Sequence, residues 1–289
     1  MMNIYETVRS GLFFNKFEVD DIIFVEYACP IEDESTVIWS QSDYLVHVLS
    51  GKKTWRTIEG TWTISAGQTV FIKKGAAIID QFFDEEFCML GFFISDDFIE
   101  HTIKEYSGKI EDITPKENLH ATAIEVNNDE IMYTYYQSLL PYFRGEKKPT
   151  NELLILKMKE LILNIFANPE NIQLAAYLKS LTGSGKTSIR EIMEANFCYN
   201  LSLDDYAQMC NRSLSSFKRD FQRHFGISPG KWLRNKRLEY SATLLHHSDL
   251  NISQIVFESG FEDLSHFSRV FKEKFGISPF RFRKNPVTH

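Results

Sequence analysis

Long hydrophobic runs and cysteine pairs are both missing from this sequence of 289 residues. No apolar stretch approaches the ~20 residues that a membrane-spanning helix needs, and the first residues lack the pattern of a secretory signal. The four cysteines, Cys29, Cys88, Cys198 and Cys210, are scattered without a CxxC pair, unlike a disulfide framework or a zinc site. We therefore expect a cytoplasmic protein that does not associate with a membrane.

A nucleotide-binding loop is also absent. Residues 183–187 read GSGKT, but Ser180 stands where a phosphate-binding loop requires its first glycine. The preceding residues have a helical pattern, whereas such a loop follows a strand. We predict instead that the polar stretch 179–187 is a linker.

Charge is unevenly distributed along the chain. The net charge is -7, yet residues 201–289 contain 14 basic and 9 acidic residues, a balance of +5, which leaves -12 for the remainder. One hydrophobic core rarely serves more than ~250 residues, so the length favours two domains. An acidic body with a basic C-terminal domain is expected if only one domain contacts nucleic acid.

Residues 22–95 have the pattern of antiparallel strands. Gly51, Gly60, Gly67 and Gly75 recur at spacings of 9, 7 and 8 residues between short segments rich in β-branched and aromatic residues. This rhythm is typical of a sandwich or small barrel, and helical patterns follow from about residue 97. The expected strands are IIFVEYAC, YLVHVLSG, TWRTI, TWTI, TVFIKK, AIIDQFF and FCMLGFFI.

The segment 150–166 predicts a helix that is apolar on nearly all sides. Such a helix is buried on more than one side. We expect one stripe to pack on its own domain and the other to contact a second copy in a homodimer, with burial inside one domain as the alternative. The first stripe contains Leu154, Met158, Leu161 and Ile165; the second contains Leu153, Leu156 and Leu163.

The strongest signal is an internal repeat. Residues 214–229 and 264–279 are identical at ten of sixteen aligned positions, at an offset of 50. In each copy, leucine and phenylalanine residues recur at helical spacing, a glycine follows at the expected C-cap, and Ser-Pro begins another helix. A shorter helix is expected before each copy, with bends at 210–212 and 259–261. Helix, tight turn and basic-faced helix together predict two helix-turn-helix units.

The outer faces of the repeated helices carry hydrogen-bonding and basic side chains, which suit base edges and phosphates in a major groove. Basic residues at 231–237 and 281–284 are expected to contact phosphates. The predicted DNA-binding residues are Ser215, Ser216, Lys218, Arg219, Gln222 and Arg223 in the first copy, and Ser265, His266, Ser268, Arg269 and Lys272 in the second.

The C-terminal segment ISQIVFESGFEDLSHFSRVFKEKFGISPFRFR strongly resembles the signature of the AraC/XylS transcription regulators. The resemblance covers about 188–289 and implies a seven-helix domain with two helix-turn-helix units, which often activates transcription beside RNA polymerase. Ser215, Lys218 and Arg219 would then face bases from one helix, and Ser265, His266 and Arg269 from the other. One departure is Val256, where the family usually has alanine.

The N-terminal half is similar to the family's regulatory domain, which implies an α+β chain with a cupin-like β-barrel to about residue 96 and helices over 97–178. The resemblance thus implies a regulatory and dimerisation domain at 1–178 and a DNA-binding domain at 188–289. ISAGQTVFIKKGAAII is similar to the subgroup that activates type III secretion genes, in which a partner protein controls activity. A cupin-type metal site needs two or three histidines with a carboxylate, whereas His47 is the one histidine in the expected strands. We predict no metal, no cofactor and no enzymatic activity.

The mode of regulation stays open between two alternatives. A small-molecule effector could bind inside the barrel, where Trp39, Tyr44, His47 and Trp55 are candidate pocket residues. Aromatic residues and a histidine at strand spacing are more often core, and polar pocket residues are scarce. We therefore favour an interaction domain that acts through an antagonist protein or dimerisation.

Overall fold

The computed structural model describes residues 1–11, 14–28, 34–83, 86–106, 121–182 and 188–284. The chain separates into two compact units, Met1–Thr187 and Ser188–His289. The GSGKT segment and Cys29 lie outside the described residues. Lys179 and Ser180, the first two residues of the predicted linker, belong to helix α5 (Ile172–Ser180), so the linker is corrected to begin after Ser180. The rest of the linker and the domain limits stay predictions.

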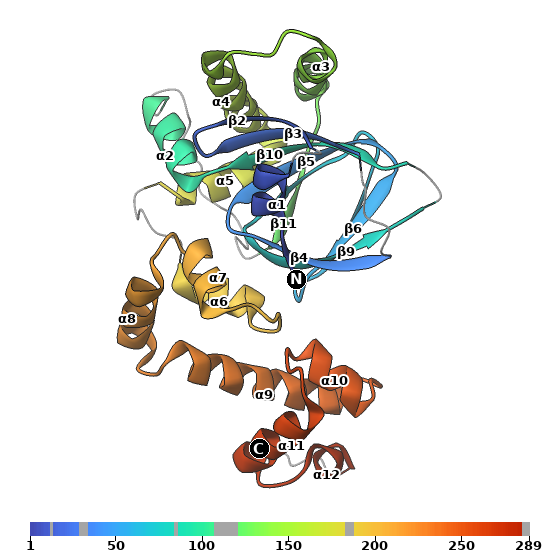
Figure 1. Ribbon diagram of the computed structural model, residues 1–289, viewed down its shortest axis with the longest axis vertical. Helices are drawn as coiled ribbons and strands as arrows, with labels where there is room; N and C mark the ends of the chain where they lie inside the picture. Colours follow the sequence, from blue (N-terminus) through green and yellow to red (C-terminus); the bar gives the residue numbers. More distant parts are fainter. Residues whose placement is uncertain (12–13, 29–33, 84–85, 107–120, 183–187, 285–289) are drawn as a thin grey trace. The chain divides into compact units, whose positions relative to one another are not determined.

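The N-terminal unit is built on two β-sheets (Figure 1). Their strand orders are β1-β4-β9-β6-β7 and β11-β8-β5-β10-β3-β2. β1 pairs with β4 in parallel, and the other strand pairs are antiparallel. The strands are β1 (Met2–Asn3), β2 (Asn15–Val19), β3 (Ile22–Ala28), β4 (Ser35–Ser40), β5 (Asp43–Ser50), β6 (Lys52–Arg56), β7 (Thr61–Ser65), β8 (Thr69–Ile72), β9 (Gly75–Gln81), β10 (Cys88–Ile94) and β11 (Ala123–Val126).

This arrangement confirms the α+β class and refines the expected barrel. The seven predicted strand segments correspond to β3 and to β5 through β10, whereas β1, β2, β4 and β11 were not predicted. Among the described residues, the strand ladders form two sheets rather than one closed barrel. The strands of the expected cupin-like domain are therefore arranged as two sheets.

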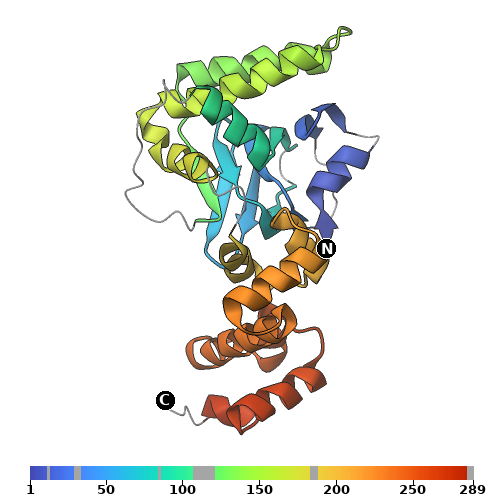
Figure 2. The same cartoon turned by 90° about the vertical axis from the view of Figure 1, so that its left-hand side faces the viewer.

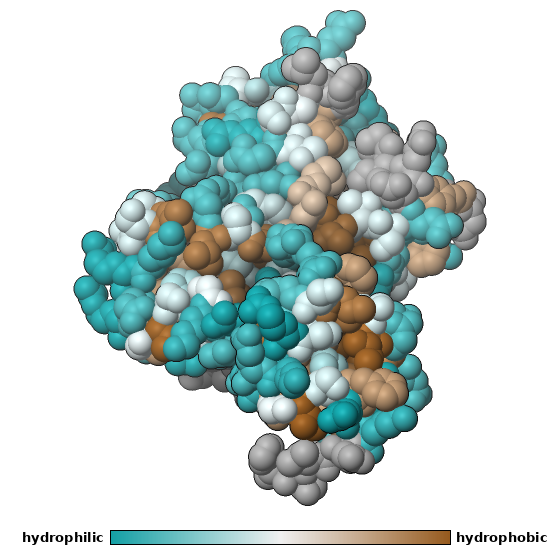
Figure 3. Space-filling model, turned by 60° about the horizontal axis from the view of Figure 1, so that its bottom comes forward, coloured by the Kyte–Doolittle hydropathy of each residue, from teal (hydrophilic) through white to brown (hydrophobic). Residues whose placement is uncertain are grey.

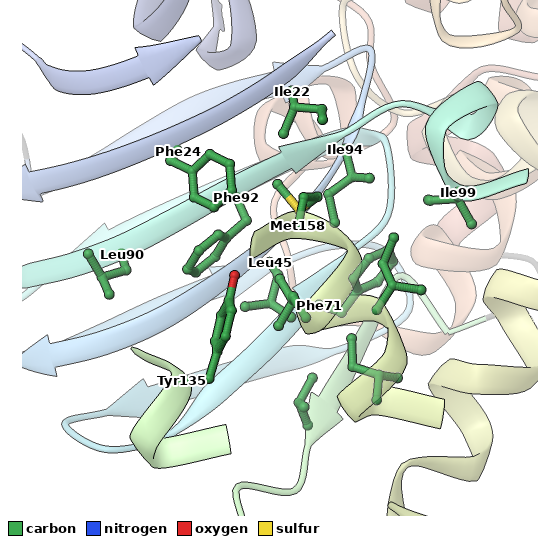
Figure 4. Close-up of a cluster of buried hydrophobic side chains, with 14 of the residues drawn as sticks. Ile22, Phe24, Leu45, Phe71, Leu90, Phe92, Ile94, Ile99, Tyr135 and Met158 are labelled. Atoms are coloured by element: carbon green, nitrogen blue, oxygen red, sulfur yellow. The ribbon is translucent and has the colours of Figure 1, made fainter. Parts of the chain in front are cut away.

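Both faces of the six-stranded sheet are buried. Side chains alternate along a strand, so Tyr44 and Val46 on β5 face the core between the two sheets, while Leu45 between them faces the helices. Figure 4 shows the helix-facing core, in which Tyr135 and Met158 lie over the strand residues. Alternating aliphatic and aromatic residues thus fill two cores on opposite sides of one sheet.

The helices of this unit begin at side-chain caps where polar residues precede apolar stripes. Ser95, Asp129 and Thr150 each accept a hydrogen bond from the backbone N–H three residues later. Figure 2 shows α3 and α4, in green and yellow-green, lying side by side as a helical pair. The helices are α1 (Ile4–Ser10), α2 (Asp96–Glu105), α3 (Glu130–Arg144), α4 (Asn151–Ala167), the 3-10 helix η1 (Pro169–Asn171) and α5 (Ile172–Ser180).

The described part of the C-terminal unit is helical. Gly226 and Gly276 end the repeated helices with φ angles of 70° and 80°, the left-handed conformation that glycine adopts without steric cost. Ser228 accepts from the N–H of Lys231 and begins the next helix, with Pro229 in its first turn. The helices are α6 (Ile189–Asn196), α7 (Leu203–Met209), α8 (Leu214–Phe225), α9 (Pro229–His247), α10 (Ile252–Glu258), α11 (Leu264–Phe275) and α12 (Pro279–Lys284).

Candidate DNA-binding interface

Two helix-turn-helix units are formed, α7–α8 and α10–α11, each with a sharp bend between its helices. Asn211 and Gly260 occupy the bends with φ angles of 51° and 83°. Ala207 and Val256, which occupy equivalent positions on α7 and α10, are 0% and 1% exposed. The larger Val256 is therefore accommodated in the core of the second unit.

Phenylalanine side chains fix the inner faces of α8 and α11. Phe217, Phe221, Phe267 and Phe271 are each 0% exposed, and consecutive rings along each helix contact one another. Full burial of a side chain of this size contributes about 1.5–3 kcal/mol. This packing sets the rotation of each helix and so determines which residues remain on its outer face.

The connecting helix α9 contacts both units. Near its start, Trp232 packs edge-on against Phe221, with 6.0 Å between ring centroids. Further along, Leu238, Ala242 and Leu245 join the core that contains Phe267 and Phe271. Figure 1 shows α9 as a long helix with α8 at its start and α10 and α12 toward its end.

The predicted DNA-binding residues lie on the outer faces of α8 and α11. Figure 3 shows hydrophilic side chains predominating on the face turned to the viewer, with hydrophobic patches between them. Ser216 and Ser268 are half-buried, and the others are exposed: Ser215, Lys218, Arg219, Gln222, Arg223, Ser265, His266, Arg269 and Lys272.

Several of these side chains already have partners. The side-chain amide of Gln222 donates to the carbonyl of Gly226 at 2.9 Å, which closes the C-terminus of α8. Arg269 Nη1 lies 3.1 Å from Glu273 Oε1, in a pair whose side chains are 65% and 59% exposed. An exposed pair of this kind contributes at most about 1 kcal/mol, so Arg269 can exchange Glu273 for a DNA group.

The basic stretches expected to contact phosphates divide into two groups. Arg237 donates to the carbonyls of Phe197 and Tyr199, at 2.6 and 2.7 Å, and Arg283 donates to Leu250 O at 2.6 Å. Both arginines therefore hold segments of their own domain together, and the phosphate assignment is corrected for them. Exposed residues such as Lys231 and Arg234 remain the predicted phosphate contacts.

Comparisons with known proteins agree with this geometry. Residues 43–177 match the ExsA N-terminal regulatory domain, and residues 206–285 match a helix-turn-helix domain.

The chain belongs to the AraC/XylS family of transcription regulators.

Relatives of this AraC/XylS regulator span most of its length. The virulence regulon transcriptional activator VirF of Yersinia enterocolitica is 23% identical over 241 residues, which cover 83% of this chain and 88% of VirF. The HTH-type transcriptional regulator ExsA of Pseudomonas aeruginosa is 23% identical over 223 residues, covering 74% and 76% of the two chains. A crystal structure of apo ToxT from Vibrio cholerae aligns with a TM-score of 0.45 and 15% identity, over 92% of this chain and 98% of ToxT.

The N-terminal unit of the regulator contains an apolar cavity of about 160 Å³. Tyr44 and Trp55, two of the candidate pocket residues, lie on its wall, with Val46 and Phe93 beside them. Among the described lining residues, Lys53 alone carries a charge, and its Nζ lies 4.3 Å from the centroid of the Phe87 ring.

Trp39 and His47, the other two candidate pocket residues, are buried outside this cavity lining. His47 lies on the opposite face of β5, stacked on Tyr136 with a centroid distance of 3.9 Å and an interplanar angle of 12°. Its Nδ1 is 2.9 Å from Thr69 Oγ1. Burial lowers the pKa of His47 to about 4, so the imidazole is neutral at physiological pH. For His47 the effector-pocket assignment is therefore corrected to a core position.

The three predicted dimerisation residues differ in exposure. Leu156 is 59% exposed on α4, whereas Leu153 and Leu163 are half-buried. The other stripe of α4, which includes Leu154 and Met158, is buried in the helix-facing core. The expected packing of one stripe on its own domain is thus observed, and dimerisation through the second stripe stays a prediction.

A buried polar network was missed at the sequence level. Asp43, which is 0% exposed, accepts from the backbone N–H of Lys74 at 2.7 Å and from the Tyr177 hydroxyl at 2.8 Å. Lys74 Nζ donates to both carboxylate oxygens of Asp96, at 2.6 and 2.5 Å. Burial raises the pKa of Asp43. No periodicity links these residues, which come from separate elements, so a sequence pattern does not show the network.

Among the described residues, no group of three or more histidine, cysteine, aspartate or glutamate side chains is arranged to hold a metal ion. None of the described helices has the length and hydropathy to cross a membrane.

Proposed function

We propose that this AraC/XylS regulator reads its operator by inserting α8 and α11 into two successive major grooves. The observation that carries the proposal is the duplicated geometry, in which two equivalent helices have buried aromatic inner faces and basic, hydrogen-bonding outer faces. The 19-residue helix α9 contacts both units and fixes their separation. Successive major grooves on one face of DNA are ~34 Å apart.

Selection of binding sites from random duplex DNA tests this proposal. The full-length chain and a 188–289 fragment should each enrich two conserved sequence blocks about one helical turn apart. Affinity that falls steeply with salt without enriching any motif would mean that the basic face contacts only phosphates, and would contradict the proposal.

In the cell we assign the protein to the cytoplasm, with no catalytic role, as an activator that acts beside RNA polymerase. The similarity of this chain to the transcriptional activator VirF and to the thermoregulatory protein LcrF of Yersinia pestis supports a regulatory role. Reporter transcription from a selected operator should rise when the protein is expressed. A fall in transcription at every operator position would identify a repressor instead.

The N-terminal unit is proposed to regulate DNA binding through dimerisation or an antagonist protein. The match to the ExsA N-terminal regulatory domain over residues 43–177 and the exposure of Leu156 support this mode. Sedimentation of the full-length chain should show a homodimer at micromolar concentration.

The apolar cavity favours a second candidate, an effector that binds within the N-terminal unit. Its lining combines aliphatic and aromatic side chains with the buried ammonium group of Lys53, which suits a small apolar molecule that carries one anionic group. Val46→Phe should fill part of the cavity. Regulation that survives this substitution would favour the partner protein, and regulation lost together with a bound small molecule would favour the effector.

A further inference from the structure

The two DNA-reading units are not identical in their turns. α10 begins 49 residues after α7, whereas α11 begins 50 residues after α8, so the second turn is one residue longer. The same backbone hydrogen bond occurs in both turns: Arg212 N donates to Ala207 O, and Phe261 N donates to Val256 O, each at 2.9 Å. Arg212 therefore occupies the place that Phe261 has in the second unit.

A second difference lies on the adjoining face of the recognition helix. Asp220 in α8 corresponds to Val270 in α11. In the second unit the two positions are apolar, with Phe261 7% and Val270 4% exposed. In the first unit they form an ion pair: Arg212 Nε is 3.5 Å from Asp220 Oδ2, and the side chains are 10% and 17% exposed.

The turn between α7 and α8 holds the arginine of this ion pair in place. Arg212 Nη1 donates to the carbonyl of Cys210 at 2.9 Å, so the guanidinium group is fixed to the bend between α7 and α8. The first unit thus places a charged pair where the second has an apolar contact. The carboxylate of Asp220 is anchored to the turn on one side and faces the outer surface of α8 on the other.

Asp220 also lies close to two arginines on that outer surface. Its Oδ1 is 3.5 Å from Arg219 Nε and 3.9 Å from Arg223 Nη1, and the arginine side chains are 66% and 69% exposed. Desolvation acts to raise the pKa of Asp220, but the neighbouring positive charges outweigh it and the pKa lies below its ordinary value. The Asp220 carboxylate is therefore ionised. It lies between Arg212, which anchors it to the turn, and the two predicted DNA contacts Arg219 and Arg223.

We propose that Asp220, anchored by Arg212, is a positioning residue that orients Arg219 and Arg223 for base reading by α8. The proposal rests on the proposed reading of a major groove by this helix. A guanidinium group reads guanine through two parallel hydrogen bonds, so its orientation matters, and restricting a long side chain beforehand reduces the entropy lost on binding. The negative charge also repels phosphates at any DNA sequence. Asp220 thus increases discrimination between sequences while it lowers general affinity for DNA.

The test uses the full-length chain and compares D220N with E273Q. D220N removes the charge of the anchored carboxylate, and E273Q makes the same chemical change beside Arg269 in the exposed pair of the second unit. Both variants should bind unselected DNA more tightly, because each loses one negative charge. We call the sequence block read by α8 the first block and the one read by α11 the second. D220N should also reduce base discrimination in the first block about tenfold and leave the second block unchanged. E273Q should leave base discrimination unchanged in both blocks.

A double variant separates positioning from folding. R212F with D220V recreates the apolar pair of the second unit, so it should keep the thermal unfolding midpoint of the parent chain. It should nevertheless lose discrimination in the first block as D220N does.

Three outcomes would overturn the proposal. If the parent chain selects both sequence blocks and D220N keeps full base discrimination in the block read by α8, the positioning role alone is overturned. Equal loss in both blocks together with a lower unfolding midpoint would assign Asp220 a structural role only. No first block for the parent chain would overturn both the positioning role and the proposed reading by α8.

Discussion

Mild acid should destabilise the N-terminal unit through one buried histidine. His47 has a pKa of about 4 in the folded chain, compared with its ordinary 6.5, because burial beneath Tyr136 disfavours the imidazolium ion. Below pH 6.5 the unfolded chain binds a proton that the folded chain does not, so the free energy of unfolding falls as the pH falls. Each pKa unit corresponds to about 1.4 kcal/mol, and the loss between pH 6.5 and 4 is therefore about 3 kcal/mol.

Urea unfolding of the full-length chain at several pH values measures this loss. In a Trp232→Phe background, the remaining tryptophans all belong to the N-terminal unit, so fluorescence reports on that unit. His47→Gln keeps a group that can hydrogen-bond to Thr69 but does not titrate. Its free energy of unfolding should lack the His47 part of the decrease. Subtracting the pH profile of His47→Gln from that of the parent chain cancels the contributions of all other groups. One of these is Asp43, whose raised pKa acts in the opposite direction to His47, because it makes the folded state more stable as the pH falls.

His101 provides the matched control, because it is exposed on α2. His101→Gln makes the same side-chain change at that exposed position and should leave the free energy of unfolding at neutral pH unchanged. The reasoning would be refuted if His47→Gln reproduced the pH profile of the parent chain, or if NMR titration of the labelled His47 ring showed a pKa near 6.5.

Three other substitutions test separate parts of the molecule. Tyr177→Phe removes the hydrogen bond to the buried Asp43 carboxylate and should lower the free energy of unfolding by about 1.5–3 kcal/mol in urea; an unchanged midpoint would show that the bond contributes nothing. Leu156→Glu places a charge on the exposed stripe of α4 and should abolish dimers while a 188–289 fragment still binds DNA; an unaltered sedimentation coefficient would reject that dimer contact. Arg269→Ala should cost about 1–3 kcal/mol at one operator position, and equal weakening on all sequences would make it a phosphate contact.

The sequence predicted the repeated units well because their signals are local. Glycine at a helix C-cap and Ser-Pro at the next helix start are read within a few residues, and Gly226 and Ser228 occur in the structure as expected. The strand pattern likewise identified most of both sheets. The helix α1, with seven residues, was missed because it is below the length at which helical periodicity is distinct, whereas the equally short α7 and α10 were expected from the repeated unit that follows each of them.

The sequence predicted less well which side chains line the cavity and which charged residues pair, because contacts between distant parts of the chain determine both. On β5, His47 lies on the same face as Leu45, as strand alternation requires. Since β5 is buried on both sides, alternation could not tell which face borders the cavity. The Arg212–Asp220 pair was also missed, because Arg212 lies before the aligned repeat and Asp220 aligns with the apolar Val270, so the alignment gives no sign that the two charged side chains meet.

Because α9 contributes to both hydrophobic cores, the duplicated readers are not independent folding units. Its start packs on Phe221, and its later turns pack on Phe267 and Phe271. Loosening either core removes support from the shared helix, so damage in one helix-turn-helix unit is expected to destabilise the other as well. An added residue within α9 would turn one reader by about 100° relative to the other and shift it by about 1.5 Å. The outer faces of the two helix-turn-helix units can therefore change independently of each other. Their spacing and their stability cannot, because both depend on α9.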